Sequence, residues 1–171
     1  SGVKITANSS VEISGKHFLI CTNGFAKRLL PYCPVNPARS QVLITSPVKN
    51  LKLKGAFHYD KGFYYFRNVG TRVLLGGARN LDIPGEATDK FGLTEKIQRR
   101  LEYILHTIIL PKSEYKIELR WSGIMGLGNQ KTTIIQPVSK NVSCAVRMGG
   151  MGVAIGSLVG EDAAKMVLKS L

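Results

Sequence analysis

The chain has no long apolar run and no block of like charges. Its 171 residues are 44% hydrophobic, yet no apolar stretch approaches the roughly 18 residues that a membrane-spanning helix needs. Lysine and arginine outnumber aspartate and glutamate by 24 to 11, but the basic residues are scattered along the chain. Because nucleic-acid and anionic-membrane interfaces need clustered positive charge, we expect a solvated basic surface, no membrane partner and no nucleic-acid partner.

Cysteine is scarce, and the spacing of Cys21, Cys33 and Cys144 matches no metal site. An odd number of cysteines without a framework is typical of reduced thiols, so we expect a cytoplasmic protein that binds no metal. No basic, apolar and small-residue leader is present, and the first residue is Ser1 rather than methionine. A first residue of this kind fits a fragment or a processed chain.

The segment from Val146 to Gly160 is the most informative part of the chain. A strand-like run, residues 143–146, breaks into glycines at 149, 150 and 152, and a helical pattern follows toward Leu168. Glycines at a strand-to-helix junction let a flat or anionic ligand approach the backbone and the free N–H groups of the helix. The same glycines also fit a plain tight turn with close helix packing. The apolar positions of this helical pattern are Val153, Ile155, Leu158, Ala163, Met166 and Val167.

The remaining pattern predicts an α+β fold. Residues 3–6 and 11–13 read as a hairpin with residues 8–10 in its turn, and residues 94–110 read as one amphipathic helix. That helix should bury Ile97, Leu101, Ile104, Leu105 and Ile108. Other short segments alternate or end at Gly, Asn and Pro as strands do. Those expected strands are residues 17–21, 41–45, 56–58, 63–67, 72–76, 115–121 and 132–136, with a short helix at 25–30.

Six segments in collinear order resemble the D-amino-acid oxidase superfamily of FAD-dependent amine and amino-acid oxidases, which includes glycine oxidase and sarcosine oxidase. The segments are residues 20–24, 35–42, 62–67, 74–79, 120–126 and 146–160. They match the C-terminal portion of such enzymes, which open with a strand, a G-x-G-x-x-G turn and a helix that hold the ADP half of FAD. No such fingerprint occurs in this chain.

The resemblance implies two interleaved lobes. Residues 1–43 and 134–171 would form part of an FAD-binding lobe, with strands and a C-terminal helix. Residues 44–133 would form the substrate-binding lobe, in which a long helix packs on an antiparallel sheet. Interleaving explains why no change of composition marks a linker. An α+β domain with a sheet is all that the pattern by itself predicts.

The resemblance also implies where FAD would bind. The segment of residues 146–160, called the glycine segment below, would lie along the pyrimidine edge of the flavin, with its backbone N–H groups facing the O2 position of the ring. The segment of residues 20–24 would pass near the ADP part, and residues 120–126 would turn sharply at Ser122-Gly123 along the other edge. No cysteine lies between 115 and 140, so FAD should be noncovalent. The expected cofactor-binding residues are Thr22, Gly24, Gly123, Gly149, Gly150, Met151, Gly152 and Val153. Valine at Gly152 is expected to obstruct the ring edge and strain the backbone.

The residues that hold a substrate carboxylate in relatives are missing here. The position of the arginine clamp matches Met125, and the second basic position matches Gly150 or Ala154. Four arginines remain as substitutes: Arg67, Arg79, Arg120 and Arg147. Tyr65 could cover the substrate, although strand alternation leaves open whether Tyr64 or Tyr65 faces the pocket. The expected substrate-binding set is therefore Tyr65, Arg67, Arg120 and Met125, and no catalytic residue is identified.

These expectations describe the C-terminal part of an FAD-dependent oxidase or dehydrogenase. It would oxidise an amine or amino acid to an imine by hydride transfer to flavin, and the isolated chain would be inactive. Its partners would be the small-molecule substrate and an N-terminal FAD-binding half, in the same or a separate chain, with self-association as another possibility. The alternative is a noncatalytic binding or assembly module that pairs with a chain carrying the ADP site. The substrate, the electron acceptor and the oligomeric state stay open.

Overall fold

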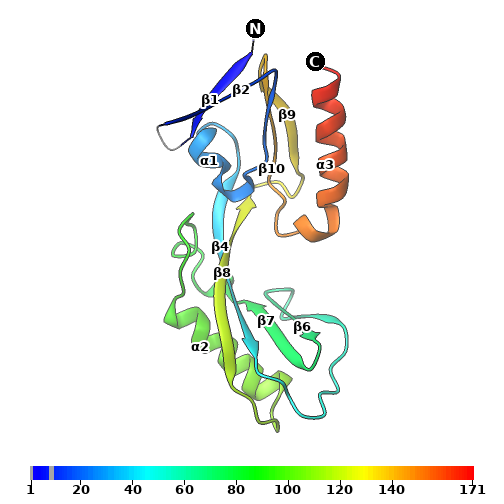
Figure 1. The fold of residues 1–171 in the computed structure, drawn as a ribbon. Helices are drawn as coiled ribbons and strands as arrows, with labels where there is room; N and C mark the ends of the chain where they lie inside the picture. Colours follow the sequence, from blue (N-terminus) through cyan, green and yellow to red (C-terminus); the bar gives the residue numbers. More distant parts are fainter. Residues whose placement is uncertain (1, 8–9) are drawn as a thin grey trace. The chain divides into compact units, whose positions relative to one another are not determined.

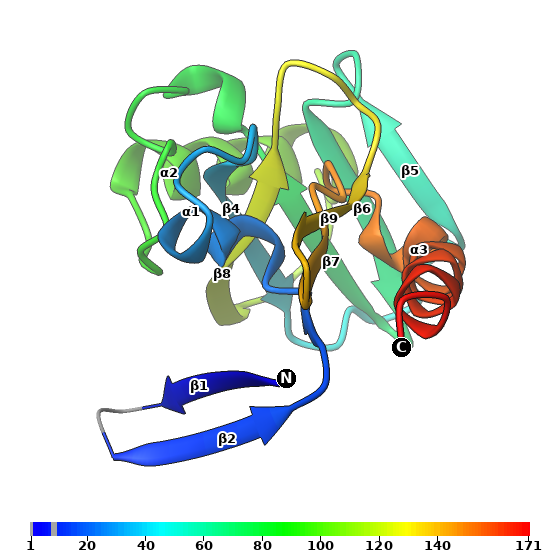
Figure 2. The same ribbon diagram turned by 90° about the horizontal axis from the view of Figure 1, so that it is seen from above.

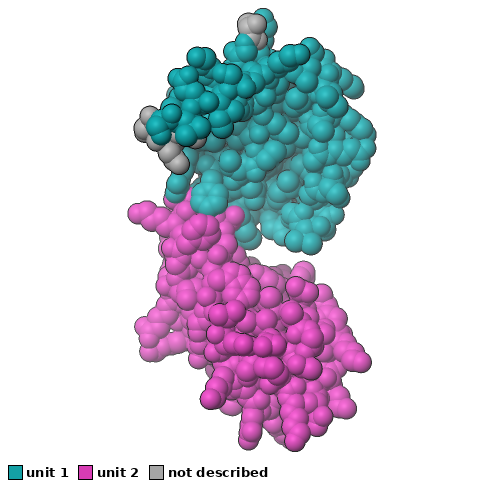
Figure 3. Space-filling view, in the orientation of Figure 1, with its two compact units in different colours: residues 1–37, 125–171 teal, residues 38–124 magenta. Residues whose placement is uncertain are grey.

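The computed structural model describes residues 2–7 and 10–171, which form two compact units (Figure 3). Unit 1 contains residues 1–37 and 125–171, and unit 2 contains residues 38–124. The boundaries fall inside two strands, β4 (Asn36–Thr45) and β8 (Ile117–Leu127), so the chain passes between the units along extended backbone. The expected α+β class, with mostly antiparallel sheets and a C-terminal helix, is confirmed.

A three-stranded sheet forms the centre of unit 1. Its strands are β3 (Phe18–Ile20), β10 (Val142–Val146) and β9 (Ile134–Ser139), with β10 in the middle. β10 runs parallel to β3 and antiparallel to β9. The long helix α3 (Gly152–Leu168) lies along this sheet, as Figures 1 and 2 show. The parallel pair brings the chain after β3 and the chain after β10 to the same edge of the sheet.

The extent of α3 agrees with the prediction, and its apolar positions are divided between a buried and an exposed side. Val159 and Ala163 are buried against Ala145 of β10, whereas Val153 and Leu158 are exposed. Residues four apart share one face of a helix, while neighbours differ by about 100°. Because apolar residues occur on several sides of this helix, the sequence pattern did not predict which face contacts the sheet.

The opposite face of the sheet is covered by a short helical segment. It consists of the 3₁₀ turn η1 (Asn23–Phe25) and the helix α1 (Ala26–Leu29). Ala26 packs in a small core with Val35, Cys144 and Val146. The hairpin predicted at the N-terminus is also present and lies apart from this sheet (Figure 2). Its strands are β1 (Val3–Ala7) and β2 (Val11–Gly15), and its expected turn at residues 8–10 falls largely outside the described residues.

Unit 2 is built on a five-stranded sheet with one helix-covered face. The strand order is β5 (Ala56–Tyr59), β6 (Tyr64–Val69), β7 (Arg72–Gly77), β4 and β8. The helix α2 (Glu95–Ile104) packs on one face of the sheet. Leucine and isoleucine from both elements fill the core between them, and the fully buried members are Leu43, Leu75, Ile97, Leu101 and Ile104.

The single helix predicted for residues 94–110 changes its winding in its second half. After α2, residues Leu105–Ile109 form a π-helix (η3), and the amide of Leu110 donates to the carbonyl of Leu105 at 2.7 Å. The wider turn places Leu105 and Leu110 in the core and leaves Ile108 43% exposed. Ile108 was predicted to be buried, and this was wrong because the α-helical period does not hold there.

A buried carboxylate fixes the loop that precedes α2 to strand β4. Glu86 is 1% exposed and accepts hydrogen bonds from Arg39 Nε at 2.9 Å and Arg39 Nη2 at 2.8 Å. Gln41 Nε2 donates to Glu86 Oε1 at 2.9 Å, and Thr94 Oγ1 donates to the same oxygen at 3.2 Å. Burial alone would raise the pKa of Glu86, but these donors outweigh it and hold the pKa below its ordinary value.

Three further findings concern the described part of the chain as a whole. None of its helices is long and apolar enough to cross a membrane. No three His, Cys, Asp or Glu side chains among the described residues gather as metal ligands would. Cys21, Cys33 and Cys144 are free thiols.

Candidate functional site

Three segments distant in sequence meet at one edge of the sheet in unit 1. The chain after β3 supplies Asn23, and the chain after β10 supplies Met148 and Gly149. The amide of Met148 donates to Asn23 Oδ1 at 3.1 Å, and the amide of Gly149 donates to the carbonyl of Gly126, at the end of β8, at 3.0 Å. In open sheets with parallel strands, ligands bind outside the carboxyl ends of those strands. This edge is therefore the candidate site.

The glycine segment at this edge presents backbone N–H groups without partners. Gly149 and Gly150 have φ values of +59° and +83°, which side chains disfavour. Met151 is the N-cap of α3 and makes no side-chain cap. Among the described residues, the amides of Gly150, Gly152 and Val153 have no acceptor. The free amides and the positive end of the helix dipole suit the electron-rich edge of a flat ligand.

The structure corrects one expectation about Gly152. This residue begins α3 without a left-handed φ, and an added Cβ would lie 3.7 Å from Met148 Cβ, an ordinary contact. A side chain at Gly152 therefore needs no backbone strain, contrary to the prediction. The left-handed φ values, which would strain any residue with a side chain, belong to Gly149 and Gly150.

The strand-end segment of residues 20–24 is fixed by a residue that the sequence reasoning missed. Asn23 has a left-handed φ of +45° and supplies the acceptor for Met148. A Cβ on Gly126 would lie 2.5 Å from Asn23 Oδ1 and 3.0 Å from Val35 Cγ2, so a side chain there would displace Asn23. Of the residues that were predicted, Thr22 is exposed and Gly24 is buried. An asparagine directly before a glycine is a recognisable signal for a left-handed turn.

The sharp turn expected at Ser122-Gly123 is not present. β8 continues as a strand through both residues to Leu127, and Gly123 lies in unit 2 with open space at its Cβ position. β8 is paired with β4 at the edge of the sheet. The ladder of backbone hydrogen bonds holds the glycine extended where its own flexibility would allow a turn.

Met125 and Gly150, which is one of the two candidates for the second carboxylate-binding position implied by the resemblance, lie together and are apolar. Met125 Sδ is 3.4 Å from the place that a Cβ on Gly150 would occupy. Met151 and Val153 beside them are exposed. No positive side chain lies at either of the two positions, so this part of the site offers an apolar wall and backbone donors.

Arg147 is not available as a substitute for the missing clamp. It is 6% exposed, and its guanidinium donates to the Thr132 carbonyl at 2.7 Å, to Thr132 Oγ1 at 3.1 Å and to the Pro34 carbonyl at 3.2 Å. Its own φ is +65°. Arg147 therefore supports the start of the glycine segment from within unit 1.

In unit 2, the face of the sheet opposite α2 carries two of the predicted substrate residues. Tyr64 is buried beneath α2 and accepts a hydrogen bond from Arg100 Nε at 3.0 Å. Strand alternation then turns Tyr65 to the other face, where its hydroxyl lies 3.3 Å from Ser40 Oγ. Tyr64 and Tyr65 thus lie on opposite faces of the sheet, and Tyr65 lies on the face that α2 does not cover. Arg67, two residues further along β6, shares the face of Tyr65 and is exposed, with no ion-pair partner in this fully described unit.

The guanidinium of Arg120 binds side chains of α2. Its Nη1 donates to Gln98 Oε1 at 2.7 Å, and its Nη2 lies 2.7 Å from Glu102 Oε1. This pairing neutralises the positive charge of Arg120, which was predicted to bind the substrate. Arg79 lies in the short 3₁₀ turn η2 (Arg79–Leu81) before α2. Arg67 is the exposed arginine that shares a face with Tyr65.

A cavity of about 400 Å³ elsewhere in unit 1 is a separate feature. Cys33 and Cys144 line it together with proline and leucine side chains, and none of its lining residues belongs to the glycine segment. Burial, followed by the neighbouring Cys33, raises the pKa of the Cys144 thiol. A buried thiol of raised pKa is unreactive, so this cavity is no candidate for covalent chemistry.

Comparison with known proteins identifies the family. The family model described as FAD dependent oxidoreductase (DAO) matches residues 1–166. The chain therefore belongs to the FAD-dependent oxidoreductase family of amino-acid and amine oxidases. No curated protein sequence matches it.

Solved structures of oxidoreductases share its fold at low sequence identity. Iminodiacetate oxidase from Chelativorans sp. BNC1 has a TM-score of 0.79 and 17% identity, and the match covers 97% of this chain and 46% of that one. Glycine oxidase from Geobacillus kaustophilus has a TM-score of 0.73 and 15% identity, and the match covers 92% of this chain and 43% of that one. L-proline dehydrogenase from P. horikoshii has a TM-score of 0.72 and 18% identity, and the match covers 92% of this chain and 44% of that one. The chain thus spans less than half the length of these relatives.

Proposed function

We propose that this chain supplies the flavin-ring loops and the substrate lobe of an FAD-dependent enzyme that oxidises an amine or an amino acid. The observation that carries the proposal is the glycine segment at the carboxyl ends of β3 and β10, with its three unpaired amides and an uncapped helix N-terminus. An electron-rich ring edge is the ligand such a segment would stabilise. Unit 1 would be the flavin lobe and unit 2 the substrate lobe.

The residues present fit a noncovalent flavin. The amides of Gly150, Gly152 and Val153 would face the pyrimidine edge, and Thr22 and Gly24 would border the ADP part. No cysteine lies between residues 115 and 140, so no thiol of that segment could tether the ring. When bound, the flavin would supply the acceptor for the hydride of the substrate carbon.

Unit 2 would orient the substrate through Tyr65 and Arg67. Both lie on the sheet face that no helix of this fully described unit covers. Arg67 would attract an anionic group, and Tyr65 would cover an apolar part. Because Met125 and Gly150 form an apolar wall, the preferred substrates would be amines, N-substituted amines or esters, and simple amino acids would bind less well.

The rest of the enzyme would come from a complementary half, meaning the part of the relatives' fold that this chain does not cover. That half would carry the ADP-binding site, in the same chain or in a separate one. Free thiols at all three cysteines support a cytoplasmic location. The 171-residue chain by itself would bind FAD weakly, would show no turnover and could self-associate.

Anaerobic reduction of bound flavin tests this proposal. The flavoprotein that contains this sequence is mixed with glycine, D-alanine, N-methyl amines and polyamines, and the flavin absorbance is followed. We expect bleaching by at least one amine, with simple amino acids slower. A stable flavoprotein that no amine or amino acid reduces would favour the noncatalytic assembly module instead.

Substitution at Gly150 tests the role of the glycine segment. Gly150→Val places a branched side chain at φ +83° against Met125, and the strain of a left-handed residue, about 1–2 kcal/mol, would displace the loop and its amides. We expect FAD affinity to fall roughly 10-fold or more, measured by fluorescence titration of the flavoprotein. Gly15→Val is the matched control, because an added Cβ there would make only ordinary contacts of 3.7–3.9 Å and the residue lies outside the glycine segment. Equal affinity of Gly150→Val and wild type would contradict the assignment.

A further inference from the structure

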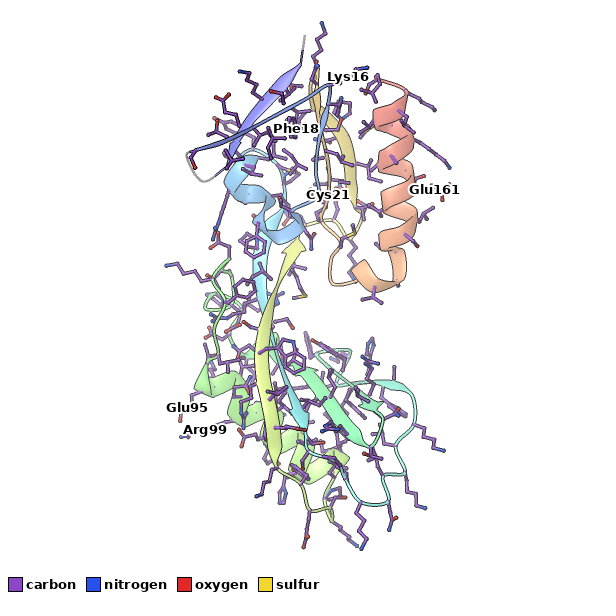
Figure 4. All side chains as sticks on the ribbon, in the orientation of Figure 1. Lys16, Phe18, Cys21, Glu95, Arg99 and Glu161 are labelled. Atoms are coloured by element: carbon purple, nitrogen blue, oxygen red, sulfur yellow. The ribbon has the colours of Figure 1, made fainter. Side chains whose placement is uncertain are left out.

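Arg147 carries a buried positive charge that no carboxylate among the described residues pairs with. It is 6% exposed, and its three hydrogen bonds all go to carbonyl or hydroxyl oxygens. The acidic residues of unit 1 are Glu12, Glu161 and Asp162. Glu12 and Glu161 each pair with a lysine, and Figure 4 shows Glu161 on the side of α3 turned away from β9 and β10. Because buried charges in proteins are normally paired, Arg147 is suited to an anionic ligand.

The guanidinium of Arg147 keeps two N–H groups for such a ligand. A guanidinium has five N–H donors. Nε and one N–H of Nη2 bind Thr132, and one N–H of Nη1 binds the Pro34 carbonyl. One N–H on each terminal nitrogen therefore has no acceptor among the described residues. Two such donors on one guanidinium can hold two oxygens of the same oxyanion, which is the strong form of this contact.

A pocket of about 290 Å³ lies against Arg147. Its other lining residues are Pro34, Asn36, Asn129 and Gln130, and the three with carboxamide side chains are exposed. Arg147 is thus the buried, charged part of the pocket. The carboxamides, each with two N–H donors, form its rim. The three free amides of the glycine segment do not line this pocket, so it is separate from the flavin site proposed above.

The backbone around Arg147 holds the guanidinium at this place. Arg147 has a φ of +65°, a conformation that is unfavourable for a residue with a side chain. Strained residues of this kind are concentrated at functional sites and ligand clamps. A Cβ on Gly128 would lie 2.6 Å from Arg147 Cδ and 2.9 Å from the Pro34 carbonyl oxygen, so glycine leaves the space that the arginine side chain occupies. A pocket, a buried charge and a strained backbone therefore coincide at one residue.

We propose that unit 1 binds a phosphate group in this pocket, either free phosphate or the phosphate of a small monoester. Two phosphate oxygens would accept hydrogen bonds from the free N–H groups of Arg147, and another oxygen would accept from the carboxamide rim. A phosphate group carries roughly 1.5 to 2 negative charges and three strong acceptor oxygens at neutral pH, whereas a carboxylate offers one charge and two oxygens. The donors in the pocket outnumber the oxygens of a carboxylate, which favours phosphate. This site does not depend on whether the chain binds FAD.

Calorimetric titration with inorganic phosphate tests the site at its rim. The protein that contains this sequence is titrated at constant ionic strength, together with its Gln130→Glu and Gln130→Lys variants. Gln130 is exposed, so neither change disturbs the core, whereas loss of Arg147 would also leave the Thr132 and Pro34 carbonyls without their donor. We expect the carboxylate of Gln130→Glu to lower phosphate affinity roughly 10-fold or more, and the ammonium of Gln130→Lys to raise it. Gln136→Glu is the matched control and should leave the affinity unchanged, since Gln136 is exposed in unit 1 and lies outside this pocket.

Glycerol phosphate and acetate, titrated in the same way, define the ligand. Tighter binding of glycerol phosphate than of inorganic phosphate would identify a monoester as the ligand, and equal affinity would identify the phosphate group alone. Both results support the site. Acetate that binds as tightly as inorganic phosphate would contradict the assignment to phosphate.

Two results would overturn the site itself. A wild-type protein that binds no phosphate is the first. A Gln130→Glu protein with unchanged affinity is the second, because the ion would then lie elsewhere, such as at the free amides that begin α3. A protein that shows the expected dependence on Gln130 but binds no FAD would support this site while the flavin proposal fails.

Discussion

Arginine in place of Met125 is expected to shift the substrate preference of the proposed enzyme toward amino acids. Met125 lies beside Gly150, at the position from which relatives are inferred to hold a carboxylate, and its thioether cannot pair with one. A charged hydrogen-bonding pair in such a site contributes about 2–5 kcal/mol. Met125→Arg should therefore raise kcat/KM for an amino acid, relative to the amine without its carboxylate, by roughly 30-fold or more.

The matched control is Met125→Gln, which has similar length and no charge. Steady-state kinetics on an amino acid and its decarboxylated amine, with flavin absorbance as the check of an intact site, would measure the ratio for both variants. An unchanged ratio in a flavin-loaded Met125→Arg protein would contradict the placement of Met125 beside the substrate carboxylate. A similar rise in Met125→Gln would show that charge is not the cause.

Replacement of Glu86 by glutamine is expected to destabilise unit 2 strongly. The substitution removes the charge that pairs with Arg39, while Gln41 and Thr94 still require their acceptor. Breaking a buried pair by removing one partner costs about 3–5 kcal/mol because the other charge stays buried. Chemical denaturation of both proteins at neutral pH measures this difference. Glu118→Gln, which breaks the exposed pair with Arg72, is the control and should change the midpoint little.

The pH dependence of the Glu86→Gln effect follows from the lowered pKa. Burial opposes ionisation, but the hydrogen bonds from Arg39, Gln41 and Thr94 prevail, so the folded pKa lies below the unfolded one. Such a group stabilises the fold fully above its unfolded pKa and loses that contribution as pH falls through the folded pKa. The stability gap between wild type and Glu86→Gln should hold constant above about pH 5 and shrink below about pH 4. A gap that widens on acidification would refute the charged pair.

The local pattern of the sequence predicted the elements but not the contacts that shape the site. The strand, glycine break and helix of residues 143–168 could be read directly, because period and glycine content are local signals. The hydrogen-bond acceptor for the Met148 amide could not be predicted from the local pattern, because Asn23 lies 125 residues away in sequence. Arg147 likewise finds Pro34 across 113 residues. Long-range partners of this kind decide whether an arginine serves a substrate or the fold.

Two predictions from the local sequence were wrong because tertiary contacts outweigh local preference. The Ser122-Gly123 pair suggested a turn, but the ladder of β8 with β4 keeps it extended. The α-helical period predicted a buried Ile108, but the π-helix after α2 rotates it outward so that Leu105 and Leu110 stay in the core. In both cases packing against neighbours outweighs the preference of the segment itself.

Titration of FAD into two samples tests the central claim most directly. One sample is the 171-residue chain, and the other is the flavoprotein or reconstituted pair with the complementary half. The account predicts stoichiometric noncovalent FAD in the second sample, because the ADP site contributes much of the grip, and binding weaker by roughly 100-fold or more in the first. A complete protein that binds no FAD would contradict the claim, and so would a monomeric 171-residue chain that retains FAD through gel filtration and oxidises an amine.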